Sequence, residues 1–171
     1  MPASLIFVYI NLIMITLKPL NLDNFWELSQ LKIGSEQEEY IPDNLFLMAM
    51  SKVLPGSEPL GVYDGDLPVG FLLHGPDAAE DAHWIHIMMI DESRQGKGYG
   101  KAAFLKLLEE IKRNRKVRRV LLAVNKGNAG AVAIYEKLGF RFNGQRFDER
   151  EWAVKVYRNL LNEEYLMELA C

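Results

Sequence analysis

Residues 83–101 read HWIHIMMIDESRQGKGYGK, and this stretch decides the fold that we expect. It opens with the segment His83–Ile90, whose side chains are mostly apolar on both faces, as in a central strand. Three alternating glycines follow, and a helical pattern runs from Gly98 to Asn114. The free N–H groups of a helix N-terminus should therefore lie close after the end of a buried strand.

This glycine-rich turn suits a phosphate ligand. Gly96, Gly98 and Gly100 let an anion approach the main chain, and the start of a helix carries a partial positive charge. Lys97 and Lys101 add positive charge nearby. No G-K-[ST] closes the turn, and its third glycine does not have the spacing of the dinucleotide-binding fingerprint. On this segment alone, a glycine turn without a ligand remains the alternative.

The rest of the chain alternates strand and helix patterns. Upstream we expect a strand at 14–19, helices at 25–33 and 44–52, and a hairpin of strands 60–63 and 68–73 around Asp64-Gly65-Asp66, followed by a loop at 75–81. Downstream we expect a strand at 117–124, a helix at 129–138, a late strand within 142–158 and a helix at 162–170. The hairpin predicts antiparallel pairing and the strand–helix–strand passages predict parallel pairing. A mixed α/β sheet with helices on both faces follows.

Bulk properties agree with a single globular domain over residues 14–171. The chain has 171 residues and a net charge of −3, so nothing suggests a nucleic-acid partner, which usually meets a basic face. Its one cysteine, Cys171, excludes an intrachain disulfide and fits a cytoplasmic location. The sequence leaves a homodimer open.

The first residues are unusually apolar. Residues 3–17 read ASLIFVYINLIMITL, which is shorter than the roughly 20 residues of a membrane-spanning helix. The run has no basic segment before it and no clear cleavage site, so we expect neither a signal peptide nor a membrane anchor. Residues 1–13 then form either an added first strand or an extension upstream of a natural start near Met14.

Two segments together resemble a known family. Residues 85–100 contain Gln95, Gly98 and Gly100 in the Q/R-x-x-G-x-G/A pattern of the acetyl-coenzyme A signature of the GNAT N-acetyltransferases. Residues 128–140, NAGAVAIYEKLGF, are similar to the family's N-x-x-A-x-x-x-Y-x-x-x-G-F element. The spacing between the two segments also agrees. The resemblance implies acetyl-CoA as co-substrate and a mixed, mostly antiparallel sheet with a splayed parallel pair.

The resemblance also assigns the cofactor contacts. It places the pyrophosphate on the main chain of the loop Gln95, Gly96, Lys97, Gly98, Tyr99, Gly100 and Lys101. It pairs the pantetheine arm with the end of the central strand at Met88, Met89 and Ile90, which requires a bulge or a splay beside strand 117–124. Asn128 would hold the arm from the other side, and it also suits a helix N-cap.

Two side chains are candidates for catalysis. Tyr135 matches the family tyrosine that points at the coenzyme sulfur, where a phenol can hydrogen-bond to or protonate the leaving thiolate. His86 stands where related enzymes often carry a glutamate base, and strand alternation puts it on one face with Met88. The alternatives are a core tyrosine and a buried structural histidine. His83 and His86 lie three apart on one strand and therefore on opposite faces, which argues against a metal site.

We expect the acidic segment 33–44 to form the acceptor wall, the side of the active site that binds the amine receiving the acetyl group. It carries four carboxylates that suit a cation, Glu36, Glu38, Glu39 and Asp43. Residues 31–52, with HWIHIMMID after them, resemble bacterial spermine/spermidine acetyltransferases, which implies a polyamine acceptor. Asp148, Glu149 and Glu151 are candidates for a second acidic wall. The alternatives are a solvated acidic turn, another amine such as an antibiotic or a protein N-terminus, and a non-catalytic acyl-CoA-binding module.

Overall fold

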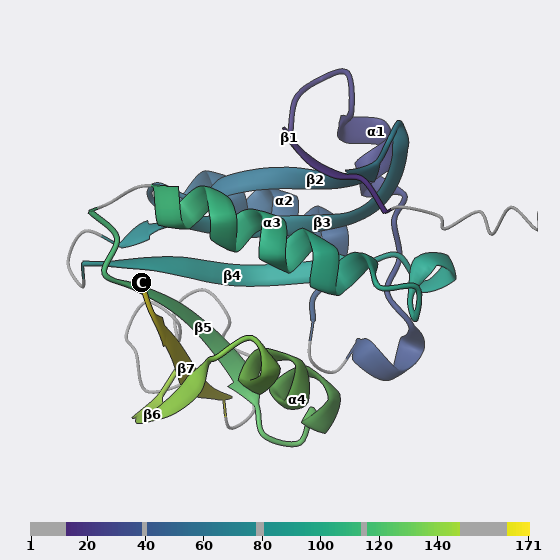
Figure 1. Ribbon diagram of the computed structural model, residues 1–171. Helices are drawn as coiled ribbons and strands as arrows, with labels where there is room; N and C mark the ends of the chain where they lie inside the picture. The colour runs from purple at the N-terminus through teal and green to yellow at the C-terminus, as the bar shows by residue number, and fades with distance from the viewer. Residues whose placement is uncertain (1–12, 39–40, 78–80, 114–115, 148–163) are drawn as a thin grey trace, which may run out of the picture.

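The computed structural model describes residues 13–38, 41–77, 81–113, 116–147 and 164–171 (Figure 1). They form one sheet in the order β1-β2-β3-β4-β5-β7-β6. The strands are β1 (Ile15–Pro19), β2 (Glu58–Asp64), β3 (Leu67–Asp77), β4 (Ala82–Ile90), β5 (Arg119–Asn125), β6 (Arg141–Arg146) and β7 (Glu164–Ala170). The pair β4–β5 is parallel and the other described pairs are antiparallel, which confirms the predicted mixed sheet with a central β4.

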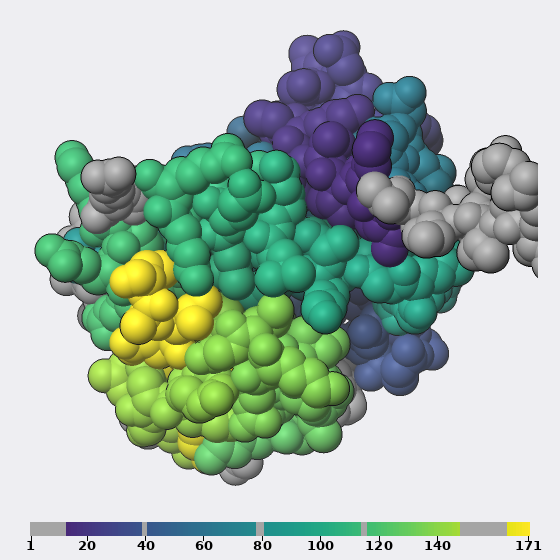
Figure 2. All heavy atoms as spheres, in the orientation of Figure 1, coloured from purple at the N-terminus to yellow at the C-terminus, as the bar shows by residue number. Residues whose placement is uncertain are grey.

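Helices cover both faces of this sheet. They are α1 (Phe25–Ser29), α2 (Asn44–Val53), α3 (Tyr99–Arg113) and α4 (Ala129–Lys137), with short 3-10 turns η1 (Ser35–Gln37) and η2 (Glu92–Arg94). In Figure 1, α3 crosses in front of β2, β3 and β4, and α2 lies behind them. The space-filling view shows β1 against α3 (Figure 2). No helix in the described ranges is long and apolar enough to cross a membrane.

Two cores result, one on each face. The first packs Leu28 of α1 and Leu47 of α2 against Trp84 and Leu121 of the sheet. The second packs α3 and α4 against the other face, with Phe104 and Leu107 fully buried. Because apolar burial drives folding, these two layers fix the central strands between them.

Two predicted boundaries were wrong. The helix predicted over 25–33 ends at Ser29, because the chain at Lys32 instead hydrogen-bonds to the turn that follows β4. The loop predicted from Gly75 begins later, because Gly75 and Pro76 still pair with β4. In both cases contacts between distant segments outweigh the local pattern.

The predicted C-terminal helix over 162–170 was also wrong. Residues 164–170 form β7, which pairs with β5 along its whole length and with β6 on its other side. Leu166 and Met167 are both fully buried, one in each core, as in a strand covered on both faces. The late strand is confirmed as β6, while Asp148, Glu149 and Glu151 lie outside the described residues.

The central strand β4 carries two irregularities that shape the site. Leu73 of β3 pairs with Ile87 and His74 pairs with Ile85, so His86 is the extra residue of a β-bulge. On the other side, β4 pairs with β5 only as far as Ile85 with Leu122. Beyond that point the two parallel strands diverge (Figure 1), which confirms the predicted splay.

Candidate active site

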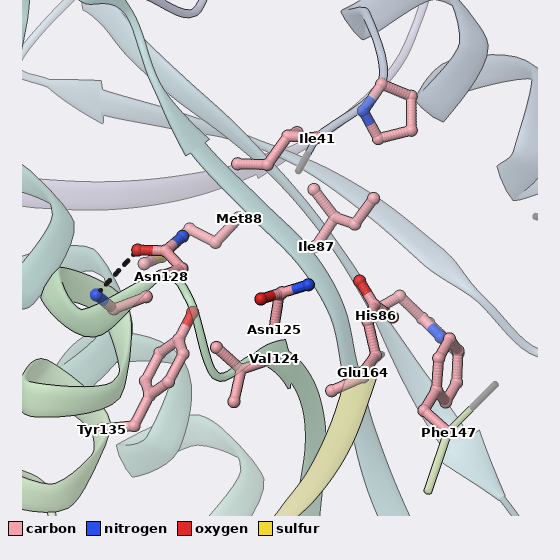
Figure 3. Close-up of a pocket in the computed structure, with 13 residues that line it drawn as sticks. Ile41, His86, Ile87, Met88, Val124, Asn125, Asn128, Tyr135, Phe147 and Glu164 are labelled. Atoms are coloured by element: carbon pink, nitrogen blue, oxygen red, sulfur yellow. Dashed lines mark hydrogen bonds between the residues drawn. The ribbon is translucent and has the colours of Figure 1, made fainter. Parts of the chain in front are cut away.

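A cavity of about 90 Å³ lies where β4 and β5 separate (Figure 3). Its walls come from six parts of the fold. β4 contributes His86, Ile87 and Met88, β5 contributes Ala123, Val124 and Asn125, α4 and its cap contribute Asn128, Ala131 and Tyr135, and Ile41, Pro42, Phe147 and Glu164 complete it. The cavity therefore contacts residues from both faces of the sheet, and both predicted catalytic residues, His86 and Tyr135, line it.

The bulge corrects the predicted orientation of His86. Strict alternation would put His86 and Met88 on one face, but Met88 packs against the α3 core. The ring of His86 instead stacks on Trp84, which belongs to the opposite core, at 6.1 Å between centroids and 9° between planes. The extra residue in β4 shifts the alternation by one. His86 therefore lies on the α2 face, across the sheet from Tyr135.

The surroundings of His86 keep its imidazole neutral at pH 7. Burial, followed by the nearby His83, lowers the pKa of His86 to about 4, and Asp77 opposes this fall. Asp77 is held by Trp84, whose Nε1–H donates to the Asp77 Oδ2 at 3.2 Å. A neutral imidazole can accept a proton, as a general base must.

Tyr135 is fixed by aromatic packing. Its ring contacts Phe104 at 5.4 Å and Phe140 at 6.1 Å between centroids. Figure 3 shows its hydroxyl directed into the cavity. Burial raises the pKa of Tyr135 to about 12, so the phenol is protonated at neutral pH and can act as a donor.

The glycine loop has the conformation that a phosphate cradle needs. Gly96 and Gly98 have φ of 73° and 89°, a region that side chains disfavour. The Ala102 N–H makes the bond to Gly98 O at 3.1 Å that opens α3, so the helix leaves the earlier amides unused. Lys101 is exposed, and Lys97 donates to Ser93 O at 2.8 Å. The loop amides after Gln95, together with these cations, fit a pyrophosphate.

Other predicted cofactor residues use their side chains within the protein. The Gln95 amide donates to Ile90 O at 2.9 Å and to the Gln37 side chain, and the Tyr99 hydroxyl donates to Asp64 at 3.0 Å. Met89 is buried on the α2 face. The side chains at these positions are therefore occupied, and the Gln95 N–H also donates to Glu92 O at 3.4 Å.

Asn128 has the predicted capping role. Its Oδ1 accepts from the Ala131 N–H at 3.1 Å at the start of α4. The same side chain lines the splay cavity. Capping therefore holds Asn128 at the position from which it would meet the pantetheine arm, and that contact remains a prediction.

An acidic pocket of about 610 Å³ adjoins the cavity and shares Ile41 and Pro42 with it. Its lining contains three carboxylates, Glu38, Asp43 and Glu92, and one ammonium, Lys32. Leu31, Ile33, Ser35, Asn44, Phe46 and Met89 complete the lining. Asp43 also caps α2 by accepting from the Phe46 N–H.

The predicted acidic residues do not all reach this pocket. Glu38 and Asp43 line it, but the Glu36 carboxylate folds back against Gly34, where an added Cβ would stand 2.5 Å from its Oε1. Glu39 lies outside the described residues. Two of the four predicted positions therefore face the pocket in the described part of the chain.

Sequence reasoning missed two carboxylates. Glu92 lines the acidic pocket and Glu164 lines the cavity. Glu92 lies two residues after the end of β4, so its place beside the strand could have marked it. The local pattern predicts a helix over 162–170, which hides Glu164; as the first residue of β7 it lies opposite Asn125.

The three histidines divide into two environments. His74 Nδ1 and His83 Nε2 lie 2.8 Å apart in the interior, while His86 belongs to the cavity. In the described part of the chain, no three His, Cys, Asp or Glu side chains gather as a metal site would require.

Comparisons with known proteins agree with this geometry. A sequence profile of the Acetyltransferase (GNAT) family matches residues 23–140. The spermine/spermidine N(1)-acetyltransferase of Bacillus subtilis (strain 168) is 32% identical over 138 residues, which cover 77% of this chain and 90% of that protein.

Solved structures share the fold. A spermidine N-acetyltransferase from Vibrio cholerae, in complex with CoA and spermine, superposes with a TM-score of 0.68 at 18% identity, covering 91% of this chain and 95% of that one. The ribosomal-protein-S18-alanine N-acetyltransferase from Escherichia coli gives a TM-score of 0.61 at 20% identity, covering 92% and 94%. The profile match over most of the chain, the splayed β4–β5 pair and the glycine loop agree: the chain belongs to the GNAT acetyltransferase family and is an acetyl-CoA-dependent N-acetyltransferase.

Proposed function

We propose that the protein acetylates a primary amine of a polyamine such as spermidine or spermine. The acidic pocket beside the cavity carries this proposal. Its three carboxylates, against one ammonium, suit a cation, and its apolar residues suit the methylene chain between amines. The similarity to a Bacillus spermine/spermidine acetyltransferase supports the same acceptor class.

In this proposal the acceptor approaches from the α2 face. Its distal cations lie among Glu38, Asp43 and Glu92, and its reacting amine reaches the splay past Ile41 and Pro42. The amine arrives as an ammonium, because alkyl amines have pKa values near 10. His86, directly or through one water, removes the first proton.

The basicity of His86 sets an energetic cost that the reaction can tolerate. A proton passing from a group of pKa about 10 to an imidazole of pKa about 4 costs about 8 kcal/mol. A turnover near 10 per second corresponds to a total barrier of about 16 kcal/mol. His86 can therefore serve as the base, with Glu164 as the carboxylate in the same cavity that favours the cationic intermediate.

The transfer itself is direct, within a ternary complex. The amine nitrogen bonds to the thioester carbonyl carbon, whose oxygen is polarised by main-chain N–H groups of residues 88–90. The carbon–sulfur bond breaks, and Tyr135 donates to the departing thiolate. The ammonium loses two protons in all, of which one ends on the thiol and one in solvent. Cys171 is exposed at the C-terminus, and we propose no acyl-enzyme.

Charge removal in the acidic pocket tests the acceptor class. We expect Glu38→Gln and Glu92→Gln each to raise the KM for spermidine by about 5-fold or more, since each removes a carboxylate that meets a desolvated cation. The KM for acetyl-CoA and the KM for a short monoamine should change little. Glu58→Gln, at an exposed position on β2, is the matched control. An unchanged KM for spermidine in both variants would reject the polyamine assignment.

A further inference from the structure

The phosphate loop and the acceptor wall are joined by hydrogen bonds. The Lys32 N–H donates to Asp91 Oδ2 at 3.0 Å, and the Glu92 N–H donates to Lys32 O at 2.8 Å. Burial disfavours the charge on Asp91, but hydrogen bonds from Ser93 and Lys32 outweigh it and lower the pKa of this carboxyl. The charged carboxylate of Asp91, as a hydrogen-bond acceptor, therefore holds the end of β4 to the segment after α1.

A second connection runs through two glutamines. Gln95, the first residue of the glycine loop, donates from Nε2 to Gln37 Oε1 at 2.6 Å and to Ile90 O at 2.9 Å. The same Gln37 oxygen accepts from the Gly34 N–H at 3.3 Å. The side-chain amide of Gln95 thus contacts both the end of β4 and the short η1 turn.

The position of Gln37 gives this contact its meaning. It lies directly before Glu38, whose carboxylate lines the acidic pocket. Glu92, which lines the same pocket, belongs to the turn that leads into the glycine loop. Glu38 and Glu92 therefore come from the two segments that the hydrogen bonds connect.

The segment between α1 and α2, which forms the acceptor wall, contains little regular secondary structure. Between the end of α1 at Ser29 and the start of α2 at Asn44, η1 is the one helical turn in the described residues. Glu36 of η1 and Glu38, which follows it, are both exposed. Leu31, Ile33 and Ile41 pack on the core of the α2 face, so the hydrogen bonds of Gln37 position the exposed residues between Ile33 and Ile41.

We propose that Gln37 is a positioning residue that couples the phosphate loop to the acceptor wall. An anion bound on the loop amides fixes Gln95, Gln95 fixes Gln37, and Glu38 is then held facing Glu92. Cofactor and cationic acceptor therefore tighten each other's binding through this contact, and the effect is reciprocal. The acceptor part rests on the proposed function; the structural coupling does not.

Hydrogen exchange with CoA alone tests the coupling without any acceptor. In the wild type, CoA should slow amide exchange in peptides covering residues 31–38. In Gln37→Met, which keeps the side-chain length but removes the accepting oxygen, this protection should be lost while the Kd for CoA stays within about 2-fold. Gln30→Ala, at an exposed glutamine whose side chain donates to Ser29 Oγ, is the matched control and should keep the protection.

A conservative variant separates positioning from general damage. Gln37→Glu retains an oxygen that can accept from Gln95 and Gly34, so it should restore the CoA-dependent protection. In titrations with spermidine, saturating CoA should tighten binding about 5-fold or more in the wild type and in Gln37→Glu, and less than about 2-fold in Gln37→Met.

Two results would overturn the proposal. One is a wild type in which CoA leaves exchange at 31–38 unchanged. The other is equal protection by CoA in Gln37→Met and the wild type. If CoA protects the segment through Gln37 but no amine is acetylated, the coupling stands and the proposed function fails.

Discussion

At the scale of single residues, the proposed mechanism divides the chemistry between Tyr135 and His86, which lie on opposite faces of the sheet. Burial raises the pKa of the Tyr135 phenol to about 12 and lowers that of the His86 imidazole to about 4, because burial disfavours the charged form of each group. At neutral pH the phenol is a donor and the imidazole an acceptor. These are the forms that amine acetylation needs at the sulfur and at the nitrogen.

The raised pKa also refines the role of Tyr135. A phenol of pKa about 12 facing a thiolate with an ordinary thiol pKa near 8.5 gives up its proton only at a cost of about 5 kcal/mol. Hydrogen-bond donation to the sulfur therefore suits Tyr135 better than complete proton transfer.

Removing the Tyr135 hydroxyl should slow turnover more than it weakens cofactor binding. Tyr135→Phe keeps the ring contacts with Phe104 and Phe140, so the fold is preserved. We expect kcat to fall about 10²-fold with little change in the Kd for CoA, as measured by thiol release and calorimetry. Tyr165→Phe is the control outside the cavity. Near-normal turnover in Tyr135→Phe would remove this residue from the mechanism.

His86 should act without titrating in the usual histidine range. Since its pKa lies near 4, it stays neutral from pH 6 to 8, and the wild-type rate should show no histidine step near pH 6.5. His86→Ala should lower kcat about 10²-fold across this range. A variant whose rates and pH profile match those of the wild type would end the assignment of His86 as the base.

The buried pair His74 and His83 should make the protein sensitive to acid. Burial lowers their pKa values to about 3 and about 4, so the unfolded chain binds more protons below its own pKa near 6.5. Stability is therefore complete above pH 6.5 and is lost as the pH falls towards 4. At pH 5 the loss should be about 2 kcal/mol for each histidine.

Thermal unfolding as a function of pH measures this effect. The double variant His74→Gln/His83→Gln should show a much shallower fall of Tm between pH 7 and pH 5 than the wild type, with His86 retaining its own share. An equal slope in both proteins would mean that the pair is not held neutral in the folded state.

At the scale of elements, the bulge and the splay in β4 convert a regular strand into a site. The bulge turns His86 towards Trp84, and the end of pairing at Ile85 opens the space beside β5. A hydrogen-bonding pattern between strands is set by both partners, so the sequence of β4 alone could not place the extra residue. The resemblance to a family suggested an irregularity here but not the face that His86 would take.

The glycine loop offers a test at this scale. Gly98→Ala forces a side chain into a φ of 89° and places its Cβ 3.4 Å from Ile13, at a cost of about 1–3 kcal/mol. We expect the Kd for CoA to rise about 10-fold or more. Gly65→Ala, in the β2–β3 turn at a φ of 61° with open space around it, carries similar strain away from the loop. Equal Kd values for the two variants would contradict the phosphate cradle.

At the scale of the whole molecule, local patterns were predictable and long-range pairings were not. The helix start after Gly98, the Asn128 cap and the Asp64-Gly65 turn each depend on a few neighbouring residues, and the structure confirms them. The strand β7 owes its conformation to β5 and β6 on either side, so its helix-like composition misled the prediction.

The same reasoning explains why the sequence predicted only part of the candidate site. Glu38 and Asp43 could be found as charges in one segment, but Glu92 and Glu164 reach the site only because the sheet brings distant segments together. The hydrogen bond between Gln37 and Gln95 joins residues 58 apart in the sequence, and no pattern in either segment predicts it. The charges of one segment therefore predicted an acidic acceptor wall, but they could not predict which carboxylates from distant segments join it.

Thiol release from acetyl-CoA across a panel of amines tests the central claim most directly. The panel contains spermidine, spermine, a short monoamine, an aminoglycoside and a peptide with a free N-terminus. The cavity and its acidic pocket predict the highest kcat/KM for spermidine or spermine, with loss of that preference in Glu38→Gln/Glu92→Gln. A preference for the peptide or the aminoglycoside would contradict the polyamine assignment, and CoA binding without turnover on any amine would contradict catalysis itself.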